Sequence, residues 1–219
     1  MTEREIEDTR QRLISIAGEV FAESGFRAAT VRDICTRAKA NIAAVNYHFG
    51  DKEGLYLAAV EAAHCNPLEL MKPDWPAALT PADKLRFFIE HMLQHLLDDR
   101  RPAWHARLMM REMAEPTQAC ANFVEAYIRP MAQTLRGILK DLLPADVGDE
   151  ELWLMGASIF GQCLFYKVHR PVVQLLMGEE AFSRLDVKRL AEHISRFSLA
   201  AISAPEDELP GTRRGEGRT

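Results

Sequence analysis

The chain has 219 residues, of which 47% are hydrophobic and 27% charged, and its formal net charge is −5. A chain of this length can bury a substantial core, and its composition excludes a wholly disordered, collagen-like or disulfide-stapled protein. The four cysteines, at positions 35, 65, 120 and 163, lie far apart without a C-x-x-C pair, which is typical of a reducing compartment. The charged N-terminus and the lack of a long apolar run favour a soluble cytoplasmic protein.

Apolar residues recur at three- and four-residue steps almost throughout the chain, so the sequence predicts an all-α fold. A first helix is expected over about 6–24, with Gly25 as a left-handed cap. Thr30, followed by Asp33, is a capping-box pattern that opens a short second helix. Asn41 is a good N-cap for a third short helix over 42–49, and a fourth helix is expected to follow Gly50.

Longer helices are expected in the second half of the chain. Prolines at 67, 73, 76 and 81 punctuate a link that is the best candidate for a domain boundary. Beyond it the periodicity predicts helices over 82–99, 102–113, 117–143, 150–169 and 187–203, with a shorter segment over 172–177. Pro130 is expected to kink or split the third of these helices. From residue 205 onward apolar residues almost vanish, which predicts a mobile tail.

Three N-terminal helices of this size, the last two joined by a three-residue turn, match a helix-turn-helix. In such a motif one helix enters the major groove of DNA while the preceding helix braces it. The spacing of Ile34, Ala38 and Val45 is suited to packing the two short helices together. Although the whole chain is acidic, bases outnumber acids between Arg10 and Lys52.

The remaining side chains of the third helix and its neighbours are candidates for contacts with DNA. Asn46 is expected to pair with adenine, and Ala43 with its neighbour Ala44 to approach thymine methyl groups. Hydroxyls, cations and the free N–H groups of a helix start suit phosphate oxygens. The predicted DNA-binding residues are Thr30, Arg32, Asn41, Ile42, Ala43, Ala44, Asn46, Tyr47, His48 and Lys52.

The run V-R-D-I-C-T-R-A-K-A-N-I-A-A-V-N-Y-H-F-G-D-K-E-G-L over 31–55 resembles the DNA-binding signature of the TetR family of transcriptional regulators. Its N-I-A-A-V-N-Y-H-F-G-D-K-E-G-L-Y portion is similar to the subgroup that includes the CecR-type regulators. The resemblance covers about residues 8–60 and places Tyr47-His48-Phe49 at the end of the recognition helix. One departure is Lys39, which stands where the family usually has glycine; a left-handed lysine costs about 1 kcal/mol.

The resemblance implies a helix-turn-helix DNA-binding domain over 1–52 and a helical effector-binding and dimerisation domain over 53–204, and the composition after residue 204 adds a disordered tail over 205–219. It implies a homodimeric repressor that a small apolar molecule releases from a palindromic operator, with no cofactor and no bound metal. A regulator that answers to a protein partner is an alternative.

Two apolar stripes in the second half suit a dimer interface formed as an intersubunit four-helix bundle, as the resemblance implies. Small residues within the first stripe allow close approach of helices. The alternative is that both stripes are core within one chain. The predicted interface residues are Leu152, Met155, Gly156, Ile159, Phe160, Cys163, Leu190, Ile194, Phe197 and Ala201.

Soft and aromatic side chains are plentiful enough to line an apolar effector chamber, although ordinary core packing explains such side chains equally well. Arg107, Arg111 and Glu112 stand in an otherwise apolar segment, where an Arg–Glu pair serves either a polar ligand group or the structure itself. The predicted effector-binding residues are Phe88, Met92, His95, Trp104, Leu108, Met109, Met113, Phe123, Tyr127 and Phe165.

A rival hypothesis is a helical-bundle metal-binding protein or enzyme that uses the second half of the chain. Glu61-x-x-His64 has the spacing of di-iron bundles, but those need a second such pair and two further carboxylates. His91 and His95 share a helix face, yet no third ligand is evident. Because no nucleophile elbow, phosphate-binding loop or dinucleotide fingerprint appears, we expect no enzymatic activity.

Overall fold

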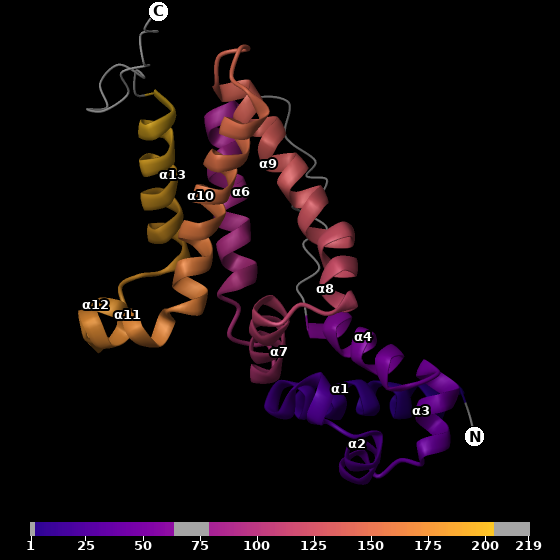
Figure 1. Ribbon diagram of the computed structural model, residues 1–219. Helices are drawn as coiled ribbons and strands as arrows, with labels where there is room; N and C mark the ends of the chain where they lie inside the picture. Colours follow the sequence, from indigo (N-terminus) through magenta and orange to yellow (C-terminus); the bar gives the residue numbers. More distant parts are fainter. Residues whose placement is uncertain (1–2, 64–78, 204–219) are drawn as a thin grey trace, which may run out of the picture. The chain divides into compact units, whose positions relative to one another are not determined.

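A computed structural model describes residues 3–63 and 79–203, and within these ranges every regular element is helical, which confirms the all-α expectation (Figure 1). The chain forms two compact units. The first unit comprises Met1–Pro67 and Asp98–Pro130, and the second comprises Leu68–Leu97 and Met131–Thr219. None of the described helices is both long and apolar enough to span a bilayer.

The first unit begins with α1 (Glu3–Ala28), α2 (Val31–Ala38), α3 (Ile42–Phe49) and α4 (Lys52–Ala63). The side chain of Thr30 accepts from the Asp33 N–H at 3.1 Å, and that of Asn41 accepts from the Ala43 N–H at 3.0 Å, so both predicted N-caps are confirmed. Lys39 is left-handed, with φ 50° and ψ 44°, as expected. Gly25 has φ 78° and ψ 167°, and this non-helical backbone divides α1 into two helical segments, so the predicted helix end at Gly25 is confirmed, although ψ is not that of a left-handed helical cap.

The rest of the first unit comes from the middle of the chain. α7 (Ala103–Ala114) packs against α1 and α4, and α8 (Gln118–Phe123) packs against α4 and α7. Trp104 of α7 approaches α1 so closely that a Cβ at Gly18 would lie 2.2 Å from its ring. These helices share one apolar core, whose fully buried side chains include Leu13, Phe21, Ile34, Val45, Leu55 and Leu108.

The helix predicted over 117–143 is split, as the proline within it led us to expect. α8 continues into a π-helical turn, η1 (Val124–Ile128), and α9 (Arg129–Leu142) then follows. Pro130 lies in the first turn of α9 and has no N–H to donate. A π turn just before it accommodates the change in hydrogen bonding.

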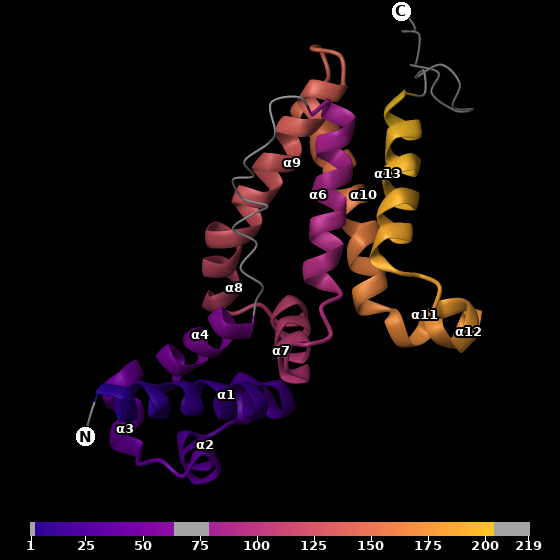
Figure 2. The same cartoon turned by 180° about the vertical axis from the view of Figure 1, so that it is seen from behind.

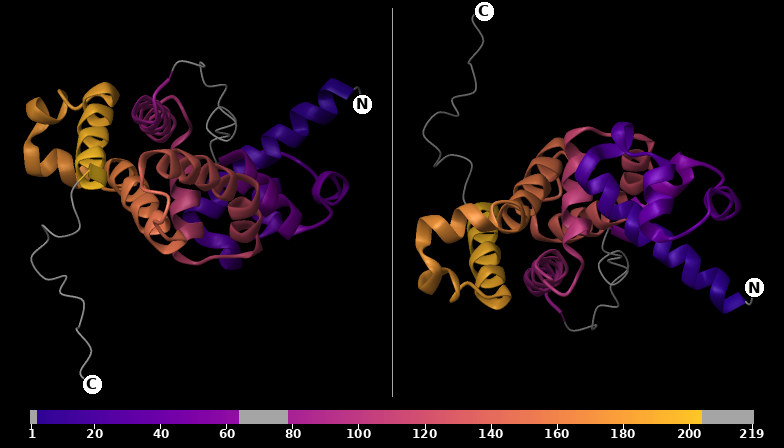
Figure 3. Two further views of the ribbon diagram at one scale, coloured as in Figure 1. Left: turned by 90° about the horizontal axis from the view of Figure 1, so that it is seen from above. Right: turned by 90° about the horizontal axis from the view of Figure 1, so that it is seen from below.

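In the second unit α6 (Pro81–Leu96) runs beside α10 (Asp149–Val168) and α13 (Val187–Ser203) (Figure 2). Between α10 and α13 the chain turns through α11 (Arg170–Met177) and α12 (Glu179–Phe182) (Figure 3). The four-residue α12 was not predicted, because so short an element shows no periodicity. The unit buries an apolar core that includes Leu85, Phe88, Ile89, Leu93, Leu139 and Ile194.

The two packing units do not follow the predicted domain boundary at residue 52. α4 joins the first unit because Leu55, Tyr56 and Ala59 are buried in the same core as α1. Residues 98–130 also belong there, although they were assigned to the second domain. The division of function into a DNA-binding part and an effector-binding part stays a prediction. The proline-rich link over 67–76 and the predicted tail over 205–219 lie outside the described residues.

Candidate nucleic-acid interface

α3 presents one face to the protein and the other to solvent. Val45 is fully buried, whereas Ile42 is 47% exposed and Tyr47 73% exposed. Ala43 and Asn46 lie on the same open side. The face expected to read base edges is therefore free of protein contacts that would prevent its entry into a major groove, which is wide enough for an α-helix.

The predicted DNA-binding residues differ in their exposure to solvent. Those that the structure leaves exposed are Thr30, Arg32, Asn41, Ile42, Ala43, Asn46 and Tyr47, and those that it leaves half-buried are Ala44, His48 and Lys52. The Lys52 ammonium donates to the Arg27 carbonyl at 3.4 Å and lies 4.7 Å from the Phe26 ring centroid. Lys52 must therefore leave these contacts before it can reach a phosphate.

Two arginines of α1 border the helix-turn-helix and were not among the predicted site residues. Arg12 Nε donates to the Ala38 carbonyl at 2.9 Å, which satisfies an acceptor at the C-terminus of α2. The Arg10 guanidinium lies 5.8 Å from the centroid of the Phe49 ring at the end of α3. The sequence places both arginines on the polar side of the first helix. It does not show which later helices that side contacts.

The angle between α3 and α4 is set by a tight turn. Asp51 accepts from the Gly54 N–H at 2.8 Å and so caps α4. A Cβ on Gly54 would lie 2.0 Å from the Phe49 carbonyl oxygen, a contact that no real side chain makes. Gly54 therefore lets the first turn of α4 rest directly on the end of α3, which fixes the direction of α3 relative to α4.

Glu112 resolves one of the alternatives left by the sequence. It is only 1% exposed, and within the described residues no ion pair joins it to Arg107 or Arg111. Its carboxylate instead accepts hydrogen bonds from Tyr56, Thr117 and Cys120. Glu112 is a structural residue of the first unit.

The predicted effector-binding residues are divided between the two units. In the first unit Trp104 and Leu108 are buried in its core, whereas Met113 is 49% exposed. In the second unit Phe88 and Met92 are core residues. The remaining members are partly buried or exposed, and these are His95, Met109, Phe123, Tyr127 and Phe165. Because the ten side chains belong to two separate packing units, a single effector chamber lined by all of them stays a prediction.

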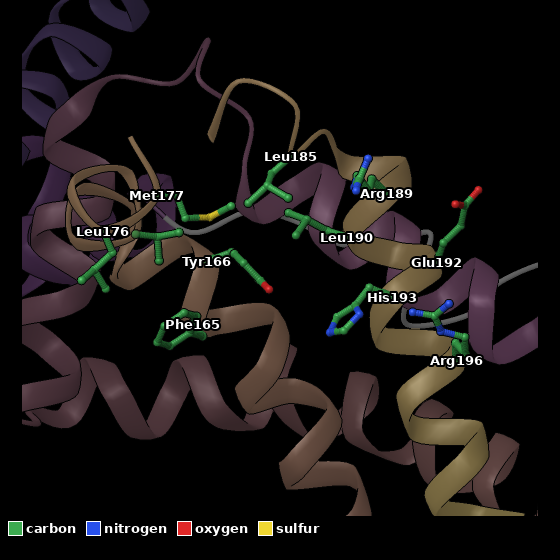
Figure 4. A pocket seen from close by; sticks show the side chains of 11 residues that line it. Phe165, Tyr166, Leu176, Met177, Leu185, Arg189, Leu190, Glu192, His193 and Arg196 are labelled. Carbon is green, nitrogen blue, oxygen red and sulfur yellow. The ribbon is translucent and has the colours of Figure 1, made fainter. Parts of the chain in front are cut away.

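A cavity of about 730 Å³ lies within the second unit, between α10, α11 and α13 (Figure 4). Aromatic and aliphatic side chains line most of it, and α13 adds polar ones. His193 projects from α13 towards the side where Phe165 and Tyr166 of α10 lie (Figure 4). Phe165 alone of the predicted effector-binding residues lines this cavity. Its volume is in the range of small-molecule sites.

The predicted dimer stripe on α10 faces the interior of its own unit. Leu152, Ile159 and Cys163 are buried, and Gly156 faces Leu135 and Leu139 of α9. On α13 Leu190 and Ile194 are likewise buried. These side chains pack in the core of one protomer, and their part in a dimer interface stays a prediction. Met155 and Phe160 are half-buried.

The opposite side of α10 and one flank of α13 carry exposed apolar side chains. On α10 Trp153 is 70% exposed, and the exposed Ala157 and Gly161 follow it at four-residue steps. On α13 Phe197 is 60% exposed, and its predicted interface neighbour Ala201 is exposed as well. These residues form one candidate interface, defined here as the α10–α13 outer face.

His91, which the sequence offered as a metal ligand, makes local contacts within α6. His91 Nδ1 lies 3.1 Å from the Phe87 carbonyl oxygen, and its ring stacks on Phe87 with centroids 3.7 Å apart. Within residues 3–63 and 79–203, no three His, Cys, Asp or Glu side chains gather in a way that could hold an ion. His64 lies outside these ranges.

Comparison with known proteins separates the chain into two matched regions. Residues 13–59 match the model of bacterial regulatory proteins of the tetR family. Residues 81–202, more than half of the chain, match the C-terminal domain of the HTH-type transcriptional dual regulator CecR.

Relatives of similar length match along most of the chain. The CecR dual regulator of Shigella flexneri is 27% identical over 187 residues, which cover 80% of this chain and 83% of that protein. A tetR-family regulatory protein from Rhodococcus RHA1 superposes with a TM-score of 0.65 at 17% identity, covering 94% of this chain and all of that one. The regulator FadR of Bacillus subtilis, solved with stearoyl-CoA, gives a TM-score of 0.59 at 19% identity, covering 88% and 98%.

Proposed function

The chain belongs to the TetR family of transcriptional regulators, with a helix-turn-helix DNA-binding domain and a CecR-type C-terminal domain, and on that premise we propose that it is a ligand-responsive repressor acting in the cytoplasm. In this proposal a homodimer binds a palindromic operator and a small apolar molecule releases it. Because the matched relatives are regulators, the proposal includes no catalytic reaction and no cofactor.

The observation that carries the DNA-binding part is the open face of α3. An exposed row of Ile42, Ala43, Asn46 and Tyr47 stands opposite the fully buried Val45. We assign Asn46 to adenine, the small and apolar side chains to thymine methyl groups, and Tyr47 to a phosphate. The exposed Thr30, Arg32 and Asn41 at the helix starts supply further backbone contacts in this proposal.

Dimerisation is supported by the α10–α13 outer face. Large exposed apolar side chains such as Trp153 and Phe197 are costly in water. The small residues Ala157 and Gly161, which follow Trp153 on α10, allow helices of two protomers to approach. A two-fold axis through this face relates α3 of one protomer to α3 of its partner. Two recognition helices about 34–36 Å apart would then read successive major grooves of a palindrome.

Release by a ligand is a population shift. The effector must bind best to a conformation whose recognition helices are wrongly spaced for the operator, since equal affinity for both conformations changes nothing. The cavity between α10, α11 and α13 offers room for such a molecule. FadR, whose solved structure contains stearoyl-CoA, is a fold neighbour and supports an apolar ligand as the first class to screen.

Selection of duplexes from a random library by the full-length protein tests this proposal. We expect enrichment of one palindromic motif, and we expect Asn46→Ala to relax the preference at one position of each half-site, by about 1–3 kcal/mol. A library that stays random after repeated rounds would refute sequence-specific regulation. An unchanged motif with Asn46→Ala would remove Asn46 from the reading residues.

A further inference from the structure

The path of the chain gives the second unit two covalent attachments to one segment of the first unit. Residues 98–130 fold into the first unit, yet both the preceding residues 68–97 and the following residues 131–219 belong to the second. Within the first unit this segment packs on α4 through α7 and α8. The chain after α4 also passes directly into the second unit at Leu68. The contacts that hold residues 98–130 against α4 therefore give a displacement of this segment a second route to α4.

Glu112 makes the most specific of these contacts. One carboxylate oxygen accepts from the Thr117 N–H at 2.7 Å, from the Thr117 hydroxyl at 2.7 Å and from the Cys120 N–H at 2.9 Å. The other oxygen accepts from the hydroxyl of Tyr56. A single carboxylate on α7 thus binds the first turn of α8 on one side and α4 on the other. Buried carboxylates are costly unless their oxygens are satisfied, and here both are.

Tyr56 is held firmly on the α4 side of this contact. It is 3% exposed, and its ring meets the rings of Phe21 and Phe26 of α1, each at a centroid distance of 4.9 Å. Burial, assisted by the bond to Glu112, raises the pKa of the Tyr56 hydroxyl above its usual value. The hydroxyl therefore remains a proton donor throughout the physiological pH range.

From Tyr56 the connection to the recognition helix is short. Gly54 lies two residues earlier on α4, and its backbone rests against the Phe49 carbonyl at the end of α3. Asp51 closes the same turn through its bond to the Gly54 N–H at 2.8 Å. A change in the position of α4 cannot be absorbed at so tight a junction, so it moves α3.

We propose that the Tyr56–Glu112 hydrogen bond is a positioning contact, which locks α4 to α7 and α8 and so fixes the orientation of α3 for DNA binding. The inference rests on the proposed function, since the orientation of α3 matters only where α3 reads DNA. Loss of the bond frees α4, and the population spreads over conformations whose recognition helices do not match the operator spacing. Tyr56 and Glu112 act through α3 and make no contact with DNA themselves.

The test compares the wild-type protein with Tyr56→Phe, which removes the hydroxyl and keeps the ring. The duplex that the wild type selects is prepared with its natural half-site spacing and with one base pair inserted or deleted. We expect Tyr56→Phe to bind the natural operator about tenfold more weakly and to discriminate less between the spacings. Binding to a random duplex should stay within twofold of wild type. Amide hydrogen exchange should accelerate in α4 of the free protein.

Thr117→Val is the comparison variant, because it removes a hydroxyl donor from the other oxygen of Glu112 and the N-cap of α8 but leaves both partners of the Tyr56–Glu112 bond in place. We expect it to lower the thermal midpoint by several degrees, as Tyr56→Phe does, and to leave operator affinity and spacing discrimination within twofold. Glu112→Gln retains an acceptor and can donate its amide to the Tyr56 oxygen. It should therefore keep most of the spacing discrimination.

The outcomes separate this inference from the function on which it rests. A Tyr56→Phe protein that is less stable but binds and discriminates as the wild type does would overturn the positioning role while leaving DNA binding intact. A wild type that selects no sequence would refute the proposed function, and the inference with it. If Tyr56→Phe proves too unstable to assay, all variants are compared in a Gly137→Ala background, since an added Cβ at this exposed helical glycine meets nothing and raises helix stability.

Discussion

Tyr47 is a large side chain that α3 presents to solvent. It is 73% exposed, its ring contacts His48 at a centroid distance of 5.0 Å, and no hydrogen bond of its hydroxyl occurs within the described part of the chain. We expect Tyr47→Phe to weaken binding to all duplexes alike, about fivefold, because a phosphate bond of about 1 kcal/mol is lost. Gel-shift titrations on operator and random duplexes measure this, and equal affinities of variant and wild type would rule out the contact.

His105 of α7 gives a residue-scale prediction about pH. Burial, and after it the charge of Arg101, lowers the pKa of His105 to about 4, from 6.5 in an unfolded chain. Its Nδ1 is buried without a partner among the described residues. Because the unfolded chain binds a proton that the folded protein resists, stability is complete above about pH 6.5 and falls as the pH drops towards 4.

We therefore expect His105→Gln, which cannot titrate, to lose less stability than the wild type between pH 7 and pH 4.5. The difference should be about 1 kcal/mol once partial solvent screening of the ring is allowed for. Denaturant unfolding at the two pH values measures it. Equal losses of unfolding free energy in both proteins would show that groups other than His105 dominate the loss of stability at low pH.

At the scale of elements, the α3–α4 junction depends on Gly54. A Cβ there would lie 2.0 Å from the backbone oxygen of Phe49, so Gly54→Ala must push α4 away from α3. We expect a loss of about 2–3 kcal/mol in the free energy of unfolding, together with weaker operator binding.

Gly137→Ala in α9 is the control, since an added Cβ at this exposed position meets nothing within 4 Å. It should stabilise the protein by about 0.5–1 kcal/mol through helix propensity alone. Thermal unfolding of both variants measures these two changes in stability. If Gly54→Ala proved as stable as the wild type, the close packing of α4 on α3 would not be required.

Most of the helices could be predicted from the sequence, but the helices that pack against one another could not. Thr30 and Asn41 mark their helix starts through bonds that reach only two or three residues along the chain, so the local sequence contains the whole signal. α10 is different, because apolar residues surround it. Leu152 and Trp153 are adjacent and equally apolar, yet only the first is buried. The packing of α6, α9 and α13 determines which side of α10 is buried. Sequence periodicity does not identify these neighbours.

The same limit applies to single residues of the candidate site. The open face of α3 follows from eight residues and a buried Val45, and the sequence predicted it. For Glu112 the sequence suggested a nearby arginine as partner, in a structural ion pair or at a ligand, because its actual partner Tyr56 lies 56 residues earlier in the chain. Lys52 was expected to be open to phosphate, but α1 supplies it with a carbonyl and an aromatic ring.

On the scale of the whole molecule, the α10–α13 outer face should determine the oligomeric state. We expect the wild type to scatter light as a particle of twice 24.7 kDa, and the double variant Trp153→Glu with Phe197→Glu to scatter as one of 24.7 kDa. Two charges buried on each side of an apolar interface cannot be paired, and this opposes association strongly. The double variant should also lose operator binding, since two half-sites then bind independently.

Met110→Glu provides the comparison, because Met110 is 45% exposed but belongs to α7 in the first unit. It should remain dimeric. A double variant that stays at twice the chain mass would place the interface elsewhere on the surface.

The most direct test of the account is a dimethyl sulfate footprint of the selected operator bound to the full-length protein. Guanine N7 faces the major groove and adenine N3 the minor groove, so this one reagent reports which groove the protein fills. We expect protection of guanine N7 in two patches about ten base pairs apart, with adenine N3 unprotected between them. Protection confined to adenine N3, or a single protected patch, would contradict the insertion of paired α3 helices into the major groove.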